Sequence, residues 1–63
     1  MRNNETHIEV MHDGRTGKFT IAMVRGADWV YIRDEPILAD ALQIAQHAAN
    51  SLGIKVIERT RDW

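Results

Sequence analysis

The fold of this chain is decided by residues 18–33, KFTIAMVRGADWVYIR. Large apolar side chains alternate with other residues on both sides of Gly26-Ala27, a pattern that is typical of two β-strands. A two-residue connection that begins with glycine favours a tight hairpin. The sequence therefore predicts strands at 18–25 and 28–33, joined so that Arg25 lies opposite Asp28.

The loop length also predicts how the two strands pair. Each aliphatic residue of one face should meet an aliphatic residue of the other strand, as a correct register requires. The expected pairs are Val24 with Trp29, Met23 with Val30, Ala22 with Tyr31, and Ile21 with Ile32.

A third strand is expected before this hairpin, at residues 6–12, where Ile8 and Val10 share one face. Asp13, Gly14, Arg15 and Thr16 are interpreted as a four-residue loop. That loop pairs Val10 with Phe19 and Ile8 with Ile21, whereas a five-residue loop would mix the two faces.

A helix is expected after the third strand of the meander. Asp34 and Glu35 suit a cap and a first turn, and Pro36 suits the first helical position. From Ile37 to Leu52 the apolar residues fill one continuous arc whose middle is mostly alanine. Gly53 is the expected residue after the helix, with Ile54 covering the last turn. Residues 54–59 then predict a final strand, and 60–63 a tail.

The order β-β-β-α-β predicts an α+β fold in which a three-stranded antiparallel meander packs on one helix and a fourth short strand follows. We expect a single domain over residues 1–63, with residues 1–5 as a disordered N-terminus. The fourth strand is expected beside the first, although pairing with another copy of the chain stays open. The residues expected to face the helix are Ile8, Val10, Phe19, Ile21, Met23, Val30 and Ile32.

Composition excludes several classes of protein. The chain has 63 residues, no cysteine and a formal net charge of −1. The absence of cysteine excludes disulfides, a thiol nucleophile and a cysteine-based zinc site. No run of about 18 apolar residues is present, which excludes a membrane-spanning helix. With a polar start at residues 1–5, we expect a cytoplasmic protein.

The face of the sheet away from the helix is unusually apolar for a surface in water. Its candidate interface residues are His7, Met11, Val24, Trp29, Tyr31 and Arg33. Because Trp, Tyr, Met and Arg are enriched in interfaces, this face is expected to bind a second copy of the chain or another protein. Two alternatives to an interface stay open. In the first, the fourth strand or Trp63 folds over this face. In the second, the aromatic cross-strand pairs serve only to stabilise the meander.

Nucleic acid is the alternative partner. Aromatic side chains beside basic ones can stack on bases and contact phosphates, here with the candidates Arg15, Lys18, Arg25 and Arg33. In its strand order and its alanine-rich helix ending at Gly53, residues 18–53 are similar to the AP2 domain and to the arm-binding domain of phage integrases. That resemblance implies DNA recognition by the sheet. The nearly balanced charge argues against it, because nucleic-acid binders usually carry a basic excess.

Catalysis finds little support in the residues. Gly14 to Lys18 lacks the spacing of a phosphate-binding loop and joins two antiparallel strands. His7 and His12 fall on opposite faces of one strand, and His47 lies on the polar side of the helix. Ser51, the one serine, lies near the end of the helix. We therefore expect no enzyme, no metal and no cofactor.

The whole pattern resembles small bacterial β-β-β-α-β domains of unknown function. This resemblance covers residues 18–62 and depends on the alanine-patterned helix, the glycine after it and the short last strand. It implies the fold and no activity. The expected function is that of a small non-catalytic interaction protein of a bacterial or phage accessory type, self-associating through its sheet.

Overall fold

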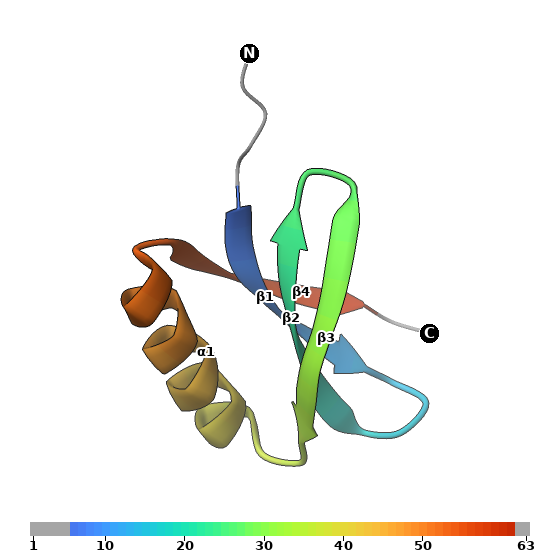
Figure 1. Ribbon diagram of the computed structural model, residues 1–63. Coiled ribbons are helices and arrows are strands. Elements are labelled where there is room, and N and C mark those ends of the chain that lie inside the picture. The colour runs from blue at the N-terminus through green and yellow to red at the C-terminus, as the bar shows by residue number, and fades with distance from the viewer. Residues whose placement is uncertain (1–5, 62–63) are drawn as a thin grey trace.

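The computed structural model describes residues 6–61 and has one four-stranded sheet with one helix on its inner face (Figure 1). The strands lie in the order β3-β2-β1-β4. β1, β2 and β3 form an antiparallel meander, and β4 runs parallel to β1. The α+β fold predicted from the sequence is confirmed. The elements are β1 (Thr6–Asp13), β2 (Lys18–Arg25), β3 (Asp28–Glu35), α1 (Leu38–Leu52) and β4 (Lys55–Arg61).

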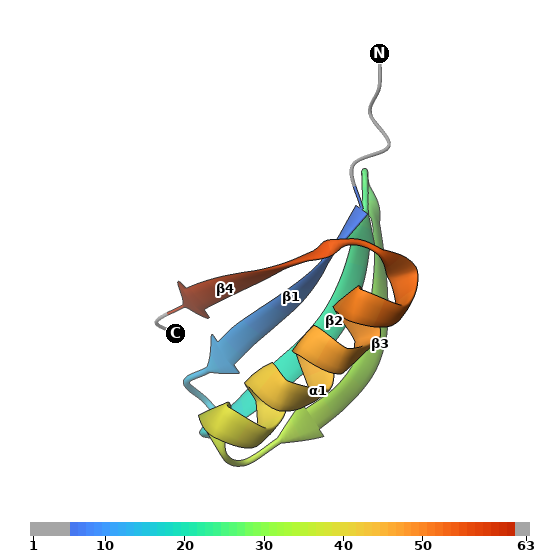
Figure 2. The same ribbon diagram turned by 90° about the vertical axis from the view of Figure 1, so that its left-hand side faces the viewer.

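The last strand lies where the sequence predicted it, beside β1. Figure 2 shows how the chain leaves the end of α1 and returns along the sheet as β4. β4 continues as far as Arg61, so residues 60 and 61 belong to the strand and not to a tail. The predictions for residues 1–5 and for Trp63 fall outside the described residues. Within residues 6–61, no helix is both long and apolar enough to cross a membrane.

The helix ends as predicted but begins differently. Gly53 has a φ of 71°, and the N–H of Ile54 donates to the carbonyl of Ala49 at 3.0 Å. These contacts satisfy carbonyls of the last turn in the expected way. At the other end Ile37 is the N-cap. Asp34 and Glu35 belong to β3, so their predicted role as helix-start residues is wrong.

The core lies between α1 and the two central strands. Ile8, Val10 and Ile21 are fully buried against Ala41, Ala45 and Ala49, which follow one another at every fourth position of the helix. Small side chains on this stripe let the helix axis approach the sheet closely. Partly buried residues complete the core: Phe19, Met23, Leu38, Leu42, Ile44, Ala48, Ile54 and Val56.

Two residues that were expected in the core are exposed. Val30 is 50% exposed and Ile32 is 38% exposed. The buried residues of the sheet come from β1 and β2, because the helix lies over the middle of the sheet and leaves β3 at an open edge (Figure 1). The predicted core residues are therefore correct for β1 and β2, whereas the two predicted on β3 are wrong.

The β1–β2 hairpin is paired two residues away from the predicted register. Asp13 lies opposite Lys18, so the loop is residues 14–17 and Val10 meets Ile21 instead of Phe19. The cause is Gly17, whose φ of 74° is suited to glycine and whose N–H donates to the carbonyl of Asp13 at 2.8 Å. The chain therefore turns with Gly17 as the last loop residue.

The β2–β3 hairpin is confirmed as far as the pair Ala22–Tyr31 and then departs from the prediction. Ile21 lies opposite Arg33 and not opposite Ile32, so β3 carries one extra residue at a β-bulge. Beyond the bulge, each residue of β3 lies on the face opposite to the one that simple alternation predicts. Arg33 shares the face of Ile21, toward the helix, and Asp34 shares the outer face with Thr20.

Candidate interaction surface

The longest run of exposed large apolar residues in the described part of the chain lies on β3. Trp29, Val30, Tyr31 and Ile32 are 48%, 50%, 54% and 38% exposed, and they follow one another without interruption. We call these four residues the β3 patch. Trp29 and Tyr31 point to the outer face, while Val30 lies opposite Met23 on the helix side. Both faces of an edge strand are therefore apolar and open to solvent.

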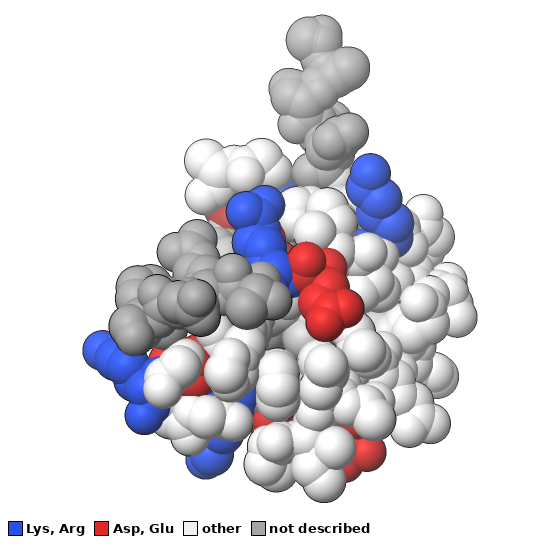
Figure 3. Space-filling view, turned by 180° about the vertical axis from the view of Figure 1, so that it is seen from behind, with Lys and Arg blue, Asp and Glu red and all other residues white. Residues whose placement is uncertain are grey.

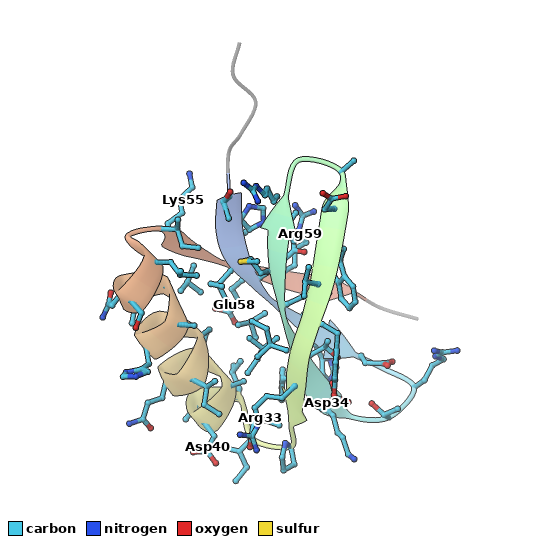
Figure 4. All side chains as sticks on the ribbon, viewed as in Figure 1. Arg33, Asp34, Asp40, Lys55, Glu58 and Arg59 are labelled. Carbon is cyan, nitrogen blue, oxygen red and sulfur yellow. The ribbon has the colours of Figure 1, made fainter. Side chains whose placement is uncertain are left out.

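The predicted interface residues are placed in three different ways. Val24 lies opposite Trp29 and joins the β3 patch on the outer face. His7 and Met11 are on the same outer face but on β1, where they are partly buried. Arg33 lies on the helix side of β3, and Figure 4 shows it there while Asp34 points to the other side. The assignment of Arg33 to the outer face is wrong because the bulge reverses it.

Polar contacts hold the end of β3 beyond the bulge. The guanidinium of Arg33 pairs with the carboxylate of Glu35 at 2.8 Å on the helix side. On the outer face the hydroxyl of Thr20 donates to the carboxylate of Asp34 at 2.9 Å. These contacts fix the strand up to Glu35 and separate the polar end of β3 from the β3 patch.

On the outer face of β1, His7 lies beside the buried carboxylate of Glu9. Glu9 is 6% exposed and forms an ion pair with Arg59 of β4, which Figure 4 labels. The Nε2 atom of His7 is buried, lies 3.8 Å from the Glu9 carboxylate and has no hydrogen-bond partner within residues 6–61. The pairing of Glu9 with Arg59 ties β1 to β4, which gives the outer face of these two strands a structural role.

The two edge strands carry four charged residues each, but these are placed differently. In β4 they are spread along the strand (Lys55, Glu58, Arg59 and Arg61), whereas in β3 they lie at its ends (Asp28, Arg33, Asp34 and Glu35). Charged edge strands resist pairing with other chains. The β3 patch has no charged residue, no lysine and no proline in its four positions. The protected edge is therefore β4, and the edge that is open to pairing is β3.

The basic residues of the nucleic-acid alternative do not gather in one place. Arg15 and Lys18 lie at the β1–β2 loop, and Arg25 lies at the opposite end of β2. Eight residues of strand separate these ends by roughly 23 Å. Arg33 and Arg25 lie on the helix side of the sheet, whereas Lys18 alternates to the outer side. Figure 3 shows Lys and Arg atoms in separate places on the face it draws, with Asp and Glu atoms among them.

The histidines are also dispersed. The ring of His12 stacks on Phe19 with the ring centroids 4.8 Å apart, on the face opposite to His7. His47 is exposed on the helix. In the part of the chain that the structure describes, no three side chains of His, Asp or Glu come together as a metal site.

Val30 and Ile32 are the surface residues that the sequence interpretation missed. A strand with one buried face alternates apolar and polar residues, but positions 29–32 are all apolar. That uninterrupted run was the available signal that both faces of β3 are apolar.

Comparisons with protein-family models, curated proteins and solved structures found no match to this chain.

Proposed function

We propose that this protein acts by binding and not by catalysis, and that it self-associates through the β3 end of its sheet. The observation that carries the proposal is the β3 patch. Six large hydrophobic residues are exposed in the described part of the chain, and four of them are consecutive in β3. A contiguous exposed apolar group of this kind usually marks an interaction site.

The residue types of this surface favour a protein partner. Trp and Tyr are enriched in interfaces and in the residues that contribute most to binding. Val24 extends the same surface onto β2. A second copy of the chain is a suitable partner because the net charge of −1 adds little repulsion between two copies.

The size of the molecule supports self-association further. The fully buried core consists of three aliphatic residues of the sheet and three alanines of the helix, together with partly buried neighbours. A domain of about 60 residues buries only about 60% of its unfolded surface. Association would bury apolar side chains that the single copy leaves in water.

Sedimentation velocity over a wide range of concentration tests this proposal. The wild-type protein should shift from monomer to dimer, and Trp29→Ala should weaken the dimer by about tenfold or more, as loss of an aromatic anchor does. Leu52→Ala is the matched control, because Leu52 is 58% exposed at the end of α1, away from β3. A protein that stays monomeric at the highest concentration, or equal effects of the two substitutions, would contradict the proposal.

Nucleic acid remains the second partner to test with the same protein. The dispersed basic residues give a single-stranded or duplex probe no continuous contact surface, so we expect no mobility shift at low salt. Binding that falls steeply with salt and is lost in Lys18→Ala would instead favour the nucleic-acid function.

A further inference from the structure

We infer that two copies of this chain pair edge to edge, β3 against β3, in an antiparallel arrangement with Val30 on the twofold axis. The two four-stranded sheets would then form one continuous sheet of eight strands. This inference rests on the proposed self-association and adds its geometry. It differs from the stacking of two outer faces, which would use Trp29 and Tyr31 but would leave the edge of β3 free.

The edge of β3 has backbone groups available for such pairing. In a hairpin with a two-residue loop, the residues that flank the loop exchange both hydrogen bonds, and the pattern then alternates along the strands. Arg25 and Asp28 flank the loop here, and Val24–Trp29 is the next pair. The N–H and C=O groups of Trp29, and by alternation those of Tyr31, are therefore directed to the open edge.

Only a few twofold registers let these outward groups meet. With Val30 on the axis, Trp29 of each copy lies opposite Tyr31 of the second copy, so both positions pair fully. With Tyr31 on the axis, Trp29 would lie opposite Arg33 of the second copy. The bulge places the side chain of Arg33 on the helix side, whereas that of Trp29 is on the outer side. With Trp29 on the axis, Tyr31 would face Ala27, which lies in the turn between the strands.

The chosen register also joins side chains that suit each other. Aromatic pairs across antiparallel strands are favourable, and this register forms two of them, Trp29 with Tyr31 and its symmetry mate. On the helix side Val30 meets Val30 of the second copy. By the same register Asp28 lies opposite Ile32 of the second copy, while the guanidinium of Arg33 in each copy keeps its ion pair with Glu35.

The area involved indicates a weak dimer. Taking about 150–250 Å² for each aromatic and somewhat less for each aliphatic side chain, the exposed fractions of the β3 patch leave on the order of 400 Å² per copy to bury. Two copies would bury about 800 Å² of side-chain surface in addition to the paired backbone, which is less than the roughly 1,200 Å² that stable specific interfaces bury. The dimer should therefore exchange with monomer as concentration changes.

A single cysteine at position 30 tests the geometry directly, because the chain has no cysteine of its own. Val30 faces its symmetry mate in a non-hydrogen-bonded pair, where the Cα atoms are about 4.5 Å apart. That distance is within the range that a disulfide spans, about 4.4–6.8 Å. Under mild oxidation Val30→Cys should form a disulfide-linked dimer at least about tenfold faster than a cysteine that meets its mate only by collision.

Leu52→Cys is the matched control, since Leu52 is at least as exposed as Val30 but lies on the helix. Circular dichroism would check that both cysteine variants fold. A third variant, Val30→Lys, would place two ammonium groups on the axis, and in sedimentation it should no longer form the dimer that the wild type forms. Equal oxidation rates of the two cysteine variants, with wild-type association intact, would overturn edge pairing and leave the proposed function standing. A wild-type protein that never associates would overturn both.

Discussion

One residue, Ile32, determines which side chains lie on each face of β3. The extra position that it occupies places Arg33 beside Ile21 on the helix side and Asp34 beside Thr20 on the outer side. Without the bulge Arg33 would join the aromatic residues, as the alternation of the sequence predicts. With the bulge the outer face of β3 loses its positive charge, which favours an apolar contact over a phosphate contact.

Glu9 is the second residue whose setting the sequence pattern does not reveal. It lies on the outer face, where strand residues are usually solvated, yet it is buried and paired with Arg59. A carboxylate in such a place costs free energy unless a cation or hydrogen bonds compensate it. Arg59 provides that compensation and also joins β4 to β1.

Removing the guanidinium should therefore destabilise the fold. We expect Arg59→Ala to lower the free energy of unfolding by about 1 kcal/mol, a value kept modest because Arg59 is half exposed. The urea midpoint measures this change. Arg25→Ala is the control, because Arg25 is exposed at the β2–β3 turn, and its midpoint should match that of the wild type. Equal midpoints of all three proteins would show that the Glu9 pair contributes no stability.

At the scale of elements, the β1–β2 hairpin shows what alternation can and cannot determine. A shift of the register by two residues keeps every side chain on its face, so the apolar pattern alone is equally satisfied by loops 13–16 and 14–17. The choice depends on which glycine adopts a positive φ. Gly17 does so, and Gly14 does not.

The two glycines of this loop give a matched pair of substitutions. Gly17→Ala should destabilise the protein by about 1–2 kcal/mol, because an alanine is strained at a φ of 74° even though a Cβ there would meet no atom within 4 Å. Gly14→Ala should be neutral or stabilise by up to about 0.5 kcal/mol through the unfolded chain. Thermal unfolding measures both. The opposite ranking would contradict a turn in which Gly17, and not Gly14, has a positive φ.

Other elements could be predicted because a local signal determines them. The β2–β3 turn follows from Gly26-Ala27, and the end of the helix follows from Gly53 and the apolar Ile54 after it. The bulge at Ile32 has no such signal, because it depends on how the end of β3 must be placed to lead into α1. The helix start was misplaced for the same reason, since Asp34 and Glu35 remain paired with β2.

At the scale of the whole molecule, the core is displaced from the middle of the meander. The buried residues of the sheet lie on β1 and β2, and β4 extends the sheet beyond β1 (Figure 2). β3 is the one strand that contributes neither a buried residue to the core nor a partly buried residue packed against it. Periodicity predicts all three strands of the meander under the helix, because it indicates which face of a strand is apolar and not how many strands one helix covers. The apolar residues left over on β3 are those that the proposed dimer would cover.

Stability should consequently depend on concentration. A partner that binds only the folded chain stabilises it by mass action. If raising the concentration well above the dissociation constant of the dimer adds about 1 kcal/mol per chain, the midpoint of thermal unfolding should rise by about 4–8 °C for a domain of this size. Calorimetry of the wild-type protein at low and high concentration measures the rise. Val30→Lys should keep one midpoint at both concentrations, equal to the dilute wild-type value, because its β3 edge no longer pairs. A midpoint that rises equally in both proteins would place the stabilising contact elsewhere on the surface.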